Sequence, residues 1–156
     1  MERKSAELLT LFVFLAVTLA VGFLASLVTI PNIPGWYEGL HKPFFNPPNS
    51  VFAPVWTTLY VLMAVAAWRV WRKAGQRPLA LYLLQLALNF GWSFIFFGAH
   101  AIGAALVEIA LLFAAVVLAL RQFWRLDRIA GWLLMPYAAW VLFAGILNAA
   151  IWRLNG

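Results

Sequence analysis

The stretch LLTLFVFLAVTLAVGFLASLVT, residues 8–29, decides the fold class, because it runs for 22 residues without a charged side chain. A helix needs about 20 mostly apolar residues to cross the hydrocarbon core of a bilayer. A membrane-spanning strand would instead alternate apolar and polar residues over about 10 positions. The stretch shows no such alternation, so it predicts a membrane-spanning helix over residues 6–29.

Four further segments of similar length and composition follow it. We expect helices over residues 6–29, 51–71, 79–99, 103–120 and 129–152. The chain as a whole is 65% hydrophobic and 10% charged, whereas soluble domains are about 25% charged. The sequence therefore predicts an all-α integral membrane protein, a bundle of five transmembrane helices that forms a single domain over residues 1–156.

The positive charges are distributed unevenly between the predicted connections. One side of the bundle carries Arg3, Lys4, Arg69, Arg72, Lys73, Arg77, Arg121, Arg125 and Arg128, and the other carries Lys42 and Arg153. Basic residues favour the cytoplasmic side, so we expect the N-terminus in the cytoplasm and the C-terminus outside, if the membrane is an inner membrane. Charges at helix ends meet lipid headgroups, and the net charge of +6 needs no nucleic acid partner to explain it.

Residues 30–50 form the only long connection, between the first two predicted helices. The stretch HKPFFNPPNSVFAPVW, residues 41–56, combines prolines with aromatic side chains, whereas disordered segments have low hydrophobicity. We expect an ordered lid over the helix ends, with Ser50 as the N-cap of the second helix. An interfacial belt of aromatic residues is the alternative reading.

Polar and aromatic residues recur at helical spacing on two of the predicted helices. The third helix carries Tyr82, Gln85, Asn89, Trp92, Ser93 and Phe96 on one face, and the fifth carries Pro136, Trp140, Ala144, Asn148 and Trp152 at steps of four. Amides within a membrane must point into the bundle to find hydrogen-bond partners. They either hold helices together or, with the aromatic rings, line a pocket for a flat, mostly apolar guest.

Glu108 is the one acidic residue well inside a predicted helix, and we expect it to reach toward His41, Lys42 or His100. A structural role and a proton-coupling role are both open for it. We expect Arg69 and Arg153, near helix ends, to extend toward the interface. No motif of a hydrolase, phosphate-binding loop or metal site is present, and no cysteine, so neither a catalytic residue nor a metal is expected.

Four segments together resemble one family. They are WYEGLHKPFFNPP (36–48), PVWTTLY (54–60), LQLALNFGWSFIFF (84–97) and LLMPYAAWVLFAGILNAAIWRLN (133–155). The chain resembles the TspO/MBR family, which comprises the tryptophan-rich sensory proteins of bacteria and the translocator protein, or peripheral-type benzodiazepine receptor, of mitochondria. The resemblance covers nearly the whole chain.

The resemblance implies a five-helix bundle whose first loop closes over a porphyrin pocket, with protoporphyrin IX as the shared ligand class, no cofactor beyond that ligand, and a homodimer in the membrane. It implies ligand contacts by ten residues: Trp36, Tyr37, Trp56, Tyr60, Asn89, Trp92, Ser93, Phe96, Trp140 and Ala144. Lys42, near the mouth, is expected to meet propionate groups.

Three functions follow from these observations. The leading one is a receptor or carrier for porphyrins linked to tetrapyrrole regulation, transport or stress signalling. The alternatives are a light-dependent porphyrin-degrading enzyme that uses Trp56 and Trp140, and a small proton-coupled exporter that uses Glu108. Two departures from the family pattern matter: Phe45 replaces a tryptophan, and Ala149 and Ala150 stand where a sterol motif needs tyrosine.

Overall fold

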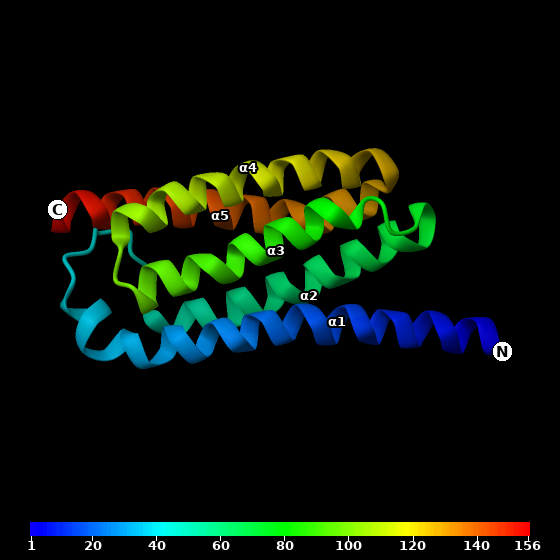
Figure 1. The fold of residues 1–156 in the computed structure, drawn as a ribbon, viewed down its shortest axis with the longest axis horizontal. Coiled ribbons are helices and arrows are strands. Elements are labelled where there is room, and N and C mark those ends of the chain that lie inside the picture. The colour runs from blue at the N-terminus through cyan, green and yellow to red at the C-terminus, as the bar shows by residue number, and fades with distance from the viewer.

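Five long helices lie side by side in the computed structural model, which describes residues 1–156 (Figure 1). They are α1 (Glu2–Thr29), α2 (Asn49–Ala74), α3 (Leu79–Ser93), α4 (Ile102–Leu126) and α5 (Arg128–Asn155). Three short turns of helix complete the structure: η1 (Ile30–Asn32), η2 (Ile33–Tyr37) and η3 (Phe94–Gly98). η3 continues directly from α3, so the third span reaches Gly98.

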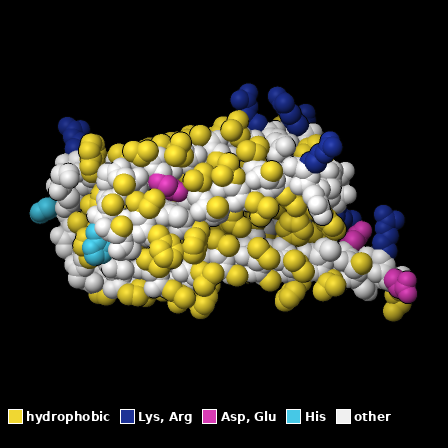
Figure 2. Space-filling model, in the orientation of Figure 1, with side chains coloured by type: hydrophobic (Ala, Val, Ile, Leu, Met, Phe, Trp, Pro, Cys, Tyr) yellow, Lys and Arg dark blue, Asp and Glu magenta, His cyan; other side chains and the backbone are white.

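All five helices are long and apolar enough to cross a membrane, which confirms the predicted class of multi-pass membrane protein. Figure 2 shows the consequence on the surface, where hydrophobic side chains cover the middle of the molecule and most of the visible Lys and Arg side chains lie toward one end. A bilayer favours this distribution, because charged groups stay at the headgroups while apolar groups meet the lipid chains.

The two ends of the bundle differ and are named here. The basic end holds the N-terminus and the α2–α3 and α4–α5 connections, and the lid end holds residues 30–48, the α3–α4 connection and the C-terminus (Figure 1). Nine of the eleven Lys and Arg residues lie at or near the basic end, and only Lys42 and Arg153 lie at the lid end.

α1 lies at the edge of the bundle, packed against α2 and α3. Only Thr18 and Ala25 of this helix are buried, and side chains such as Leu8, Phe12 and Phe23 are exposed. Hydrophobic residues on the outer face of a spanning helix meet lipid rather than water. α1 is therefore held to the bundle by one narrow face.

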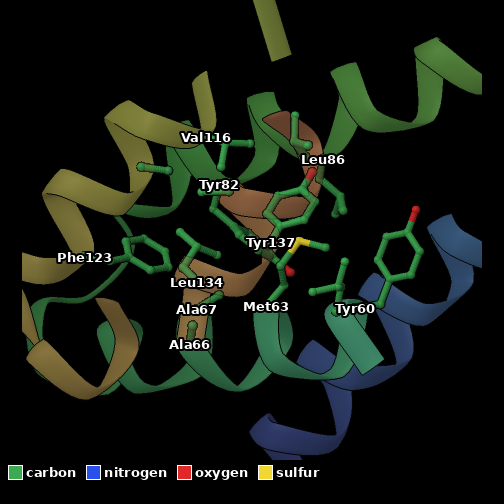
Figure 3. Packing of buried hydrophobic residues seen from close by; sticks show 14 of the residues in the cluster. Tyr60, Met63, Ala66, Ala67, Tyr82, Leu86, Val116, Phe123, Leu134 and Tyr137 are labelled. Carbon is green, nitrogen blue, oxygen red and sulfur yellow. The ribbon is translucent and has the colours of Figure 1, made fainter. Parts of the chain in front are cut away.

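The main core lies among α2, α3, α4 and α5 (Figure 3). Alanines bring the helices close together at the basic end, where Ala66, Ala67, Ala119 and Ala130 have no exposed surface. Small residues at a membrane helix interface allow the backbones to approach and gain van der Waals contact. Figure 3 shows Tyr137 of α5 at the centre of this packing, near Met63 and Leu86.

The helices run a few residues beyond most of the predicted ends, since polar residues at the interface continue the backbone hydrogen bonding. The expected N-cap at Ser50 is wrong: α2 begins at Asn49, and the cap position is Pro48, without a side-chain hydrogen bond. Pro48 has φ −57° and ψ 146°, an extended conformation that ends the loop before the helix starts.

Candidate functional site

The lid begins where α1 turns over the end of the bundle. η1 and η2 continue the chain to Tyr37, and Gly35 adopts φ +85°, a left-handed conformation that glycine adopts without steric cost. This turn places Tyr37 inward, where it is buried and its hydroxyl donates to Asn46 Oδ1 at 2.9 Å. Phe45 then packs against Phe143 of α5.

Lys42 holds the lid together from within. Its Nζ donates to the backbone carbonyls of Tyr37, Glu38 and Leu40 at 2.8, 3.2 and 3.0 Å, and lies 4.9 Å from the centre of the Tyr37 ring. An ammonium group has three N–H donors, and all three are used here. The predicted contact of Lys42 with a ligand carboxylate would require these bonds to the loop backbone to break, and it stays a prediction.

A second contact ties the lid to the far end of the chain. The His41 backbone N–H donates to Asn155 Oδ1 at 3.0 Å, and Asn155 Nδ2 donates back to the His41 carbonyl at 2.8 Å. A side-chain amide that pairs both groups of one residue in this way mimics a backbone ladder. The lid is thus fastened to the last turn of α5.

A cavity of about 510 Å³ lies beneath the lid, between α1, α2, α3 and α5, with Ile109 and Leu112 of α4 also in its wall. Pockets for small molecules span about 300–1,000 Å³. Its walls include nine of the ten predicted ligand contacts: Tyr37, Trp56, Tyr60, Asn89, Trp92, Ser93, Phe96, Trp140 and Ala144. Exposed residues of the outer surface, such as Phe23 and Thr57, also line it, so the cavity opens between α1 and α2.

Trp36 is the predicted contact that does not line the cavity. Its indole stacks on the His100 imidazole, with ring centres 4.1 Å apart and planes 9° apart, and His100 Nε2 lies 3.0 Å from Asn32 Oδ1. The Trp36 edge also meets Phe96, which does line the cavity. Trp36 therefore joins the lid to the α3–α4 connection and supports the cavity from outside.

The amides in the third helix belong to a hydrogen-bond network inside the bundle. Tyr60 donates to Asn89 Oδ1 at 2.6 Å, Asn89 Nδ2 donates to the Tyr137 hydroxyl at 2.9 Å, and Tyr137 donates to Gln85 Oε1 at 2.7 Å. Thr18 of α1 and Tyr82 of α3 form a further hydroxyl pair. These amides therefore hold helices together, and Asn89 also lines the cavity.

Asn148 has the same role nearer the lid. Its Oδ1 accepts from Trp92 Nε1 at 3.0 Å, and its Nδ2 donates to the Ile102 carbonyl at 3.0 Å. α3, α4 and α5 are thereby joined at one point. Asn148 and Asn89 also line the cavity, so a contact of these amides with a ligand stays a prediction.

Trp140 is the exception among these polar groups. Its Nε1–H is buried and has no hydrogen-bond partner, although the side chain lines the cavity. Trp56 lies beside it, with ring centres 6.4 Å apart and planes at 89°. A buried donor without an acceptor costs about 1–3 kcal/mol, so Trp140 carries an unmet hydrogen-bond donor in the cavity wall.

The predicted seam on the fifth helix is only partly correct. Trp140 and Ala144 line the cavity and Asn148 is buried, but Pro136 and Trp152 are exposed. Each step of four residues turns a helix by about 400°, so the row from 136 to 152 drifts by about 160° around the axis. Only the middle of such a row faces inward.

Glu108 lies on α4 outside the cavity. Both of its carboxylate oxygens are buried without a hydrogen-bond partner, and neither His41, Lys42 nor His100 reaches it. On α3, Gly91 lies close to this carboxyl group, since an added Cβ there would lie 3.6 Å from Oε1. The predicted contact with the lid residues is wrong, because the carboxyl group faces the groove between α3 and α4.

Sequence comparison agrees with this architecture. A profile of the TspO/MBR family matches residues 14–153. The chain belongs to the TspO/MBR family. It is 40% identical over 152 residues to a tryptophan-rich protein TspO of Archaeoglobus fulgidus, covering 96% of this chain and 99% of the relative. It is 42% identical over 126 residues to the human translocator protein, covering 77% and 75%, and 38% identical over 143 residues to a tryptophan-rich sensory protein of Cereibacter sphaeroides, covering 91% and 90%.

Proposed function

We propose that this protein is a membrane receptor or carrier that binds a porphyrin in the cavity beneath the lid. The observation that carries the proposal is the cavity of about 510 Å³, lined by Trp56, Trp92 and Trp140, in which the Trp140 N–H has no acceptor. Aromatic faces bury a flat ring, and an acceptor on the ligand would satisfy the free indole. Relatives named translocator protein and tryptophan-rich sensory protein support a role in transport or sensing.

The opening between α1 and α2 suits such a ligand. A porphyrin is apolar enough to reach the site from the bilayer, and the exposed wall residues Phe23 and Thr57 lie on that path. The lid is fastened by Lys42 and Asn155, so entry through the membrane would leave it in place. We further propose that the basic end faces the cytoplasm, since positive charges favour that side.

Saturable binding of protoporphyrin IX by the full chain in detergent tests the proposal. Tryptophan fluorescence quenching and the shift of the porphyrin absorption band provide independent readouts. Trp140→Phe keeps a ring but removes the N–H, and should weaken binding by about threefold to tenfold, the value of one net hydrogen bond. Trp140→Ala should weaken it more, because burial of the ligand is also lost.

Trp132→Phe is the matched control. Trp132 lies on the same helix, is 62% exposed and does not line the cavity, so this change should leave binding unaltered. Equal weakening by the Trp132 and Trp140 variants, or quenching that does not saturate, would contradict the proposal.

Light-dependent degradation of the porphyrin is a second candidate, favoured by the pair of indoles at the cavity wall. Trp56 and Trp140 lie close to each other and to the space that a ligand would fill. Loss of the porphyrin absorption band under illumination, dependent on Trp56, would establish it. A proton-coupled exporter receives less support, because Glu108 does not line the cavity.

A further inference from the structure

A second recess, of about 620 Å³, lies at the basic end between the start of α1 and the end of α2. It is lined by Arg3, Ala6, Glu7, Thr10, Arg69, Trp71, Arg72, Lys73, Gly75 and Asp127. Along α1 its last residue, Thr10, precedes the first residue of the porphyrin cavity, Leu19, by about 13 Å at 1.5 Å per residue. The two sites are therefore separate.

Positive charge is in excess in this recess. Four cationic side chains face two carboxylates, which leaves two positive charges (four minus two). Asp127 is held by Arg69 Nε at 2.8 Å and Lys73 Nζ at 3.4 Å. Glu7 is approached by Arg72 Nη2 at 3.0 Å. An anion of one or two charges would balance the site.

The arginines also keep unused hydrogen-bond donors. Arg69 extends to Asp127 in the α4–α5 connection, where its Nε pairs with the carboxylate, and its side chain is 27% exposed. Its two terminal amino groups have no acceptor within the protein, and the Arg72 guanidinium is fixed 4.7 Å above the Trp68 ring. Guanidinium groups held in place with free N–H donors match the oxygens of a phosphate, which they bind in pairs.

The surroundings place the recess where lipid headgroups meet lipid chains. Trp68 donates from Nε1 to Thr10 Oγ1 at 3.3 Å, and Phe14 packs against Trp71 with ring centres 6.0 Å apart. Trp residues concentrate at this level of a membrane. On the face of α1 that carries Ala6 and Thr10, Val13 and Val17 follow along the helix, and each is 50% exposed. A ligand held there meets charged donors at one end and an apolar helix surface at the other.

We propose that this recess binds the phosphodiester of an anionic phospholipid from the leaflet at the basic end, with Arg69 and Arg72 holding the phosphate oxygens and an acyl chain along Val13 and Val17. The lipid site does not require a bound porphyrin, so its test is independent of the test of the proposed function. The recess lies between α1 and α2, so the bound lipid would also fix the start of α1, which few buried residues hold.

Native mass spectrometry of the full chain, with dioleoylphosphatidylglycerol and dioleoylphosphatidylcholine as probes, tests the proposal. We expect one molecule of the anionic lipid to be retained preferentially. Arg72→Gln with Lys73→Gln should weaken its binding by about tenfold or more, because each basic residue near a charged headgroup contributes substantially. Arg121→Gln with Arg125→Gln removes the same charge from the same end but outside the recess, and should change binding by less than about threefold.

Inorganic phosphate and glycerol phosphate distinguish a lipid from a soluble phosphate. Neither should displace the lipid at millimolar concentration, since neither supplies an acyl chain. Displacement by either would overturn the lipid assignment in favour of a soluble phosphate. Equal retention of phosphatidylcholine, or equal weakening by both double variants, would overturn the site itself. If the Arg72 and Lys73 double variant does not fold, Arg3→Gln replaces it, because this side chain lines the recess and is 94% exposed. It should also weaken binding of the anionic lipid.

Discussion

The two ends of the bundle use the same helices to opposite effect. At the basic end α2, α4 and α5 meet through Ala67, Ala119 and Ala130, which have no exposed surface. At the lid end α2 and α5 carry Trp56 and Trp140, whose large rings surround a cavity. Side-chain size at the helix contacts thus decides whether the bundle closes or encloses a space.

The ends differ in polar groups as well. In the middle of the bundle Tyr137 pairs with the amides of Gln85 and Asn89. Beside the cavity the Trp140 N–H stays unpaired. A membrane interior offers no water to compensate, so this unpaired donor carries a cost of about 1–3 kcal/mol.

Removing the Tyr137 hydroxyl should produce the largest effect on the closed half. Tyr137→Phe leaves Asn89 Nδ2 and Gln85 Oε1 without the partners they have at 2.9 and 2.7 Å. Each unsatisfied buried group costs about 1–3 kcal/mol, so we expect a loss of about 2–4 kcal/mol in unfolding free energy. Reversible unfolding of the purified protein in mixed micelles measures it.

Tyr37→Phe is the control from the lid end. It removes a hydroxyl that donates to Asn46 in a partly buried site, where water can replace the bond. The expected loss is below about 1 kcal/mol. Similar losses in the two variants would show that the halves do not differ in their dependence on hydrogen bonds.

Added side-chain volume should distinguish the ends next. Ala67→Leu places a larger side chain where no surface is exposed, and overpacking of this kind costs about 1–3 kcal/mol. Ala144→Leu adds the same atoms beside the cavity, where room exists, and should cost less stability while reducing porphyrin binding. Thermal unfolding and the quenching titration, applied to both variants, separate the two outcomes.

Two glycine-to-alanine substitutions, at Gly22 and Gly145, test the packing of the cavity wall, with a smaller expected change in stability. At Gly22 an added Cβ would lie 2.5 Å from Tyr60 Cε2, so Gly22→Ala must displace a ring that lines the cavity, at about 1 kcal/mol or more. At Gly145 the nearest atom, Ile109 Cγ2, is 3.8 Å away. Gly145→Ala should therefore be neutral, or stabilising by up to about 1 kcal/mol, because alanine favours helix. Unfolding free energies of the two variants provide the measurement.

The helices and one polar face could be predicted from the sequence. Long apolar runs report helix length directly, and spacings that mix three and four residues keep Tyr82, Gln85 and Asn89 on one buried face of α3. A row at steps of four drifts around the axis, which is why Pro136 and Trp152 of α5 turned out exposed. Periodicity predicts a face only over the few turns for which the drift is small.

The partners of the polar groups could not be predicted in the same way. Tyr137 of α5 bonds to Asn89 and Gln85 of α3. The sequence shows only that a hydroxyl within a membrane span needs a hydrogen-bond partner, and it does not show which residues provide one. Lys42 pairs with carbonyls of its own loop, which a sequence does not display. Helix faces depend on local spacing, whereas hydrogen-bond partners depend on how the helices are placed against one another.

Low pH should destabilise the two ends unequally, and this is the smallest of the effects expected here. Burial alone would raise the pKa of the Asp127 carboxyl, but hydrogen bonds from Arg69 Nε and the Ile129 N–H, with the charges of Arg69 and Lys73, outweigh it and hold that pKa below its ordinary value. The unfolded carboxyl, with a pKa of about 3.9, then binds protons more readily than the folded one. Its stabilisation is present above about pH 4 and is lost as the pH falls through the folded pKa.

The basic end should therefore loosen first at low pH, by less than about 1 kcal/mol because Arg69 is partly exposed. Asp127→Asn cannot titrate, so its unfolding temperature should decline less than that of the unmodified chain as the pH falls below about 4. At the lid end the anchor of Lys42 is a set of backbone carbonyls, which do not titrate. Hydrogen exchange should accordingly rise in residues 127–131 while residues 37–46 stay protected, and a simultaneous rise in both segments would mean that the two ends unfold as one unit.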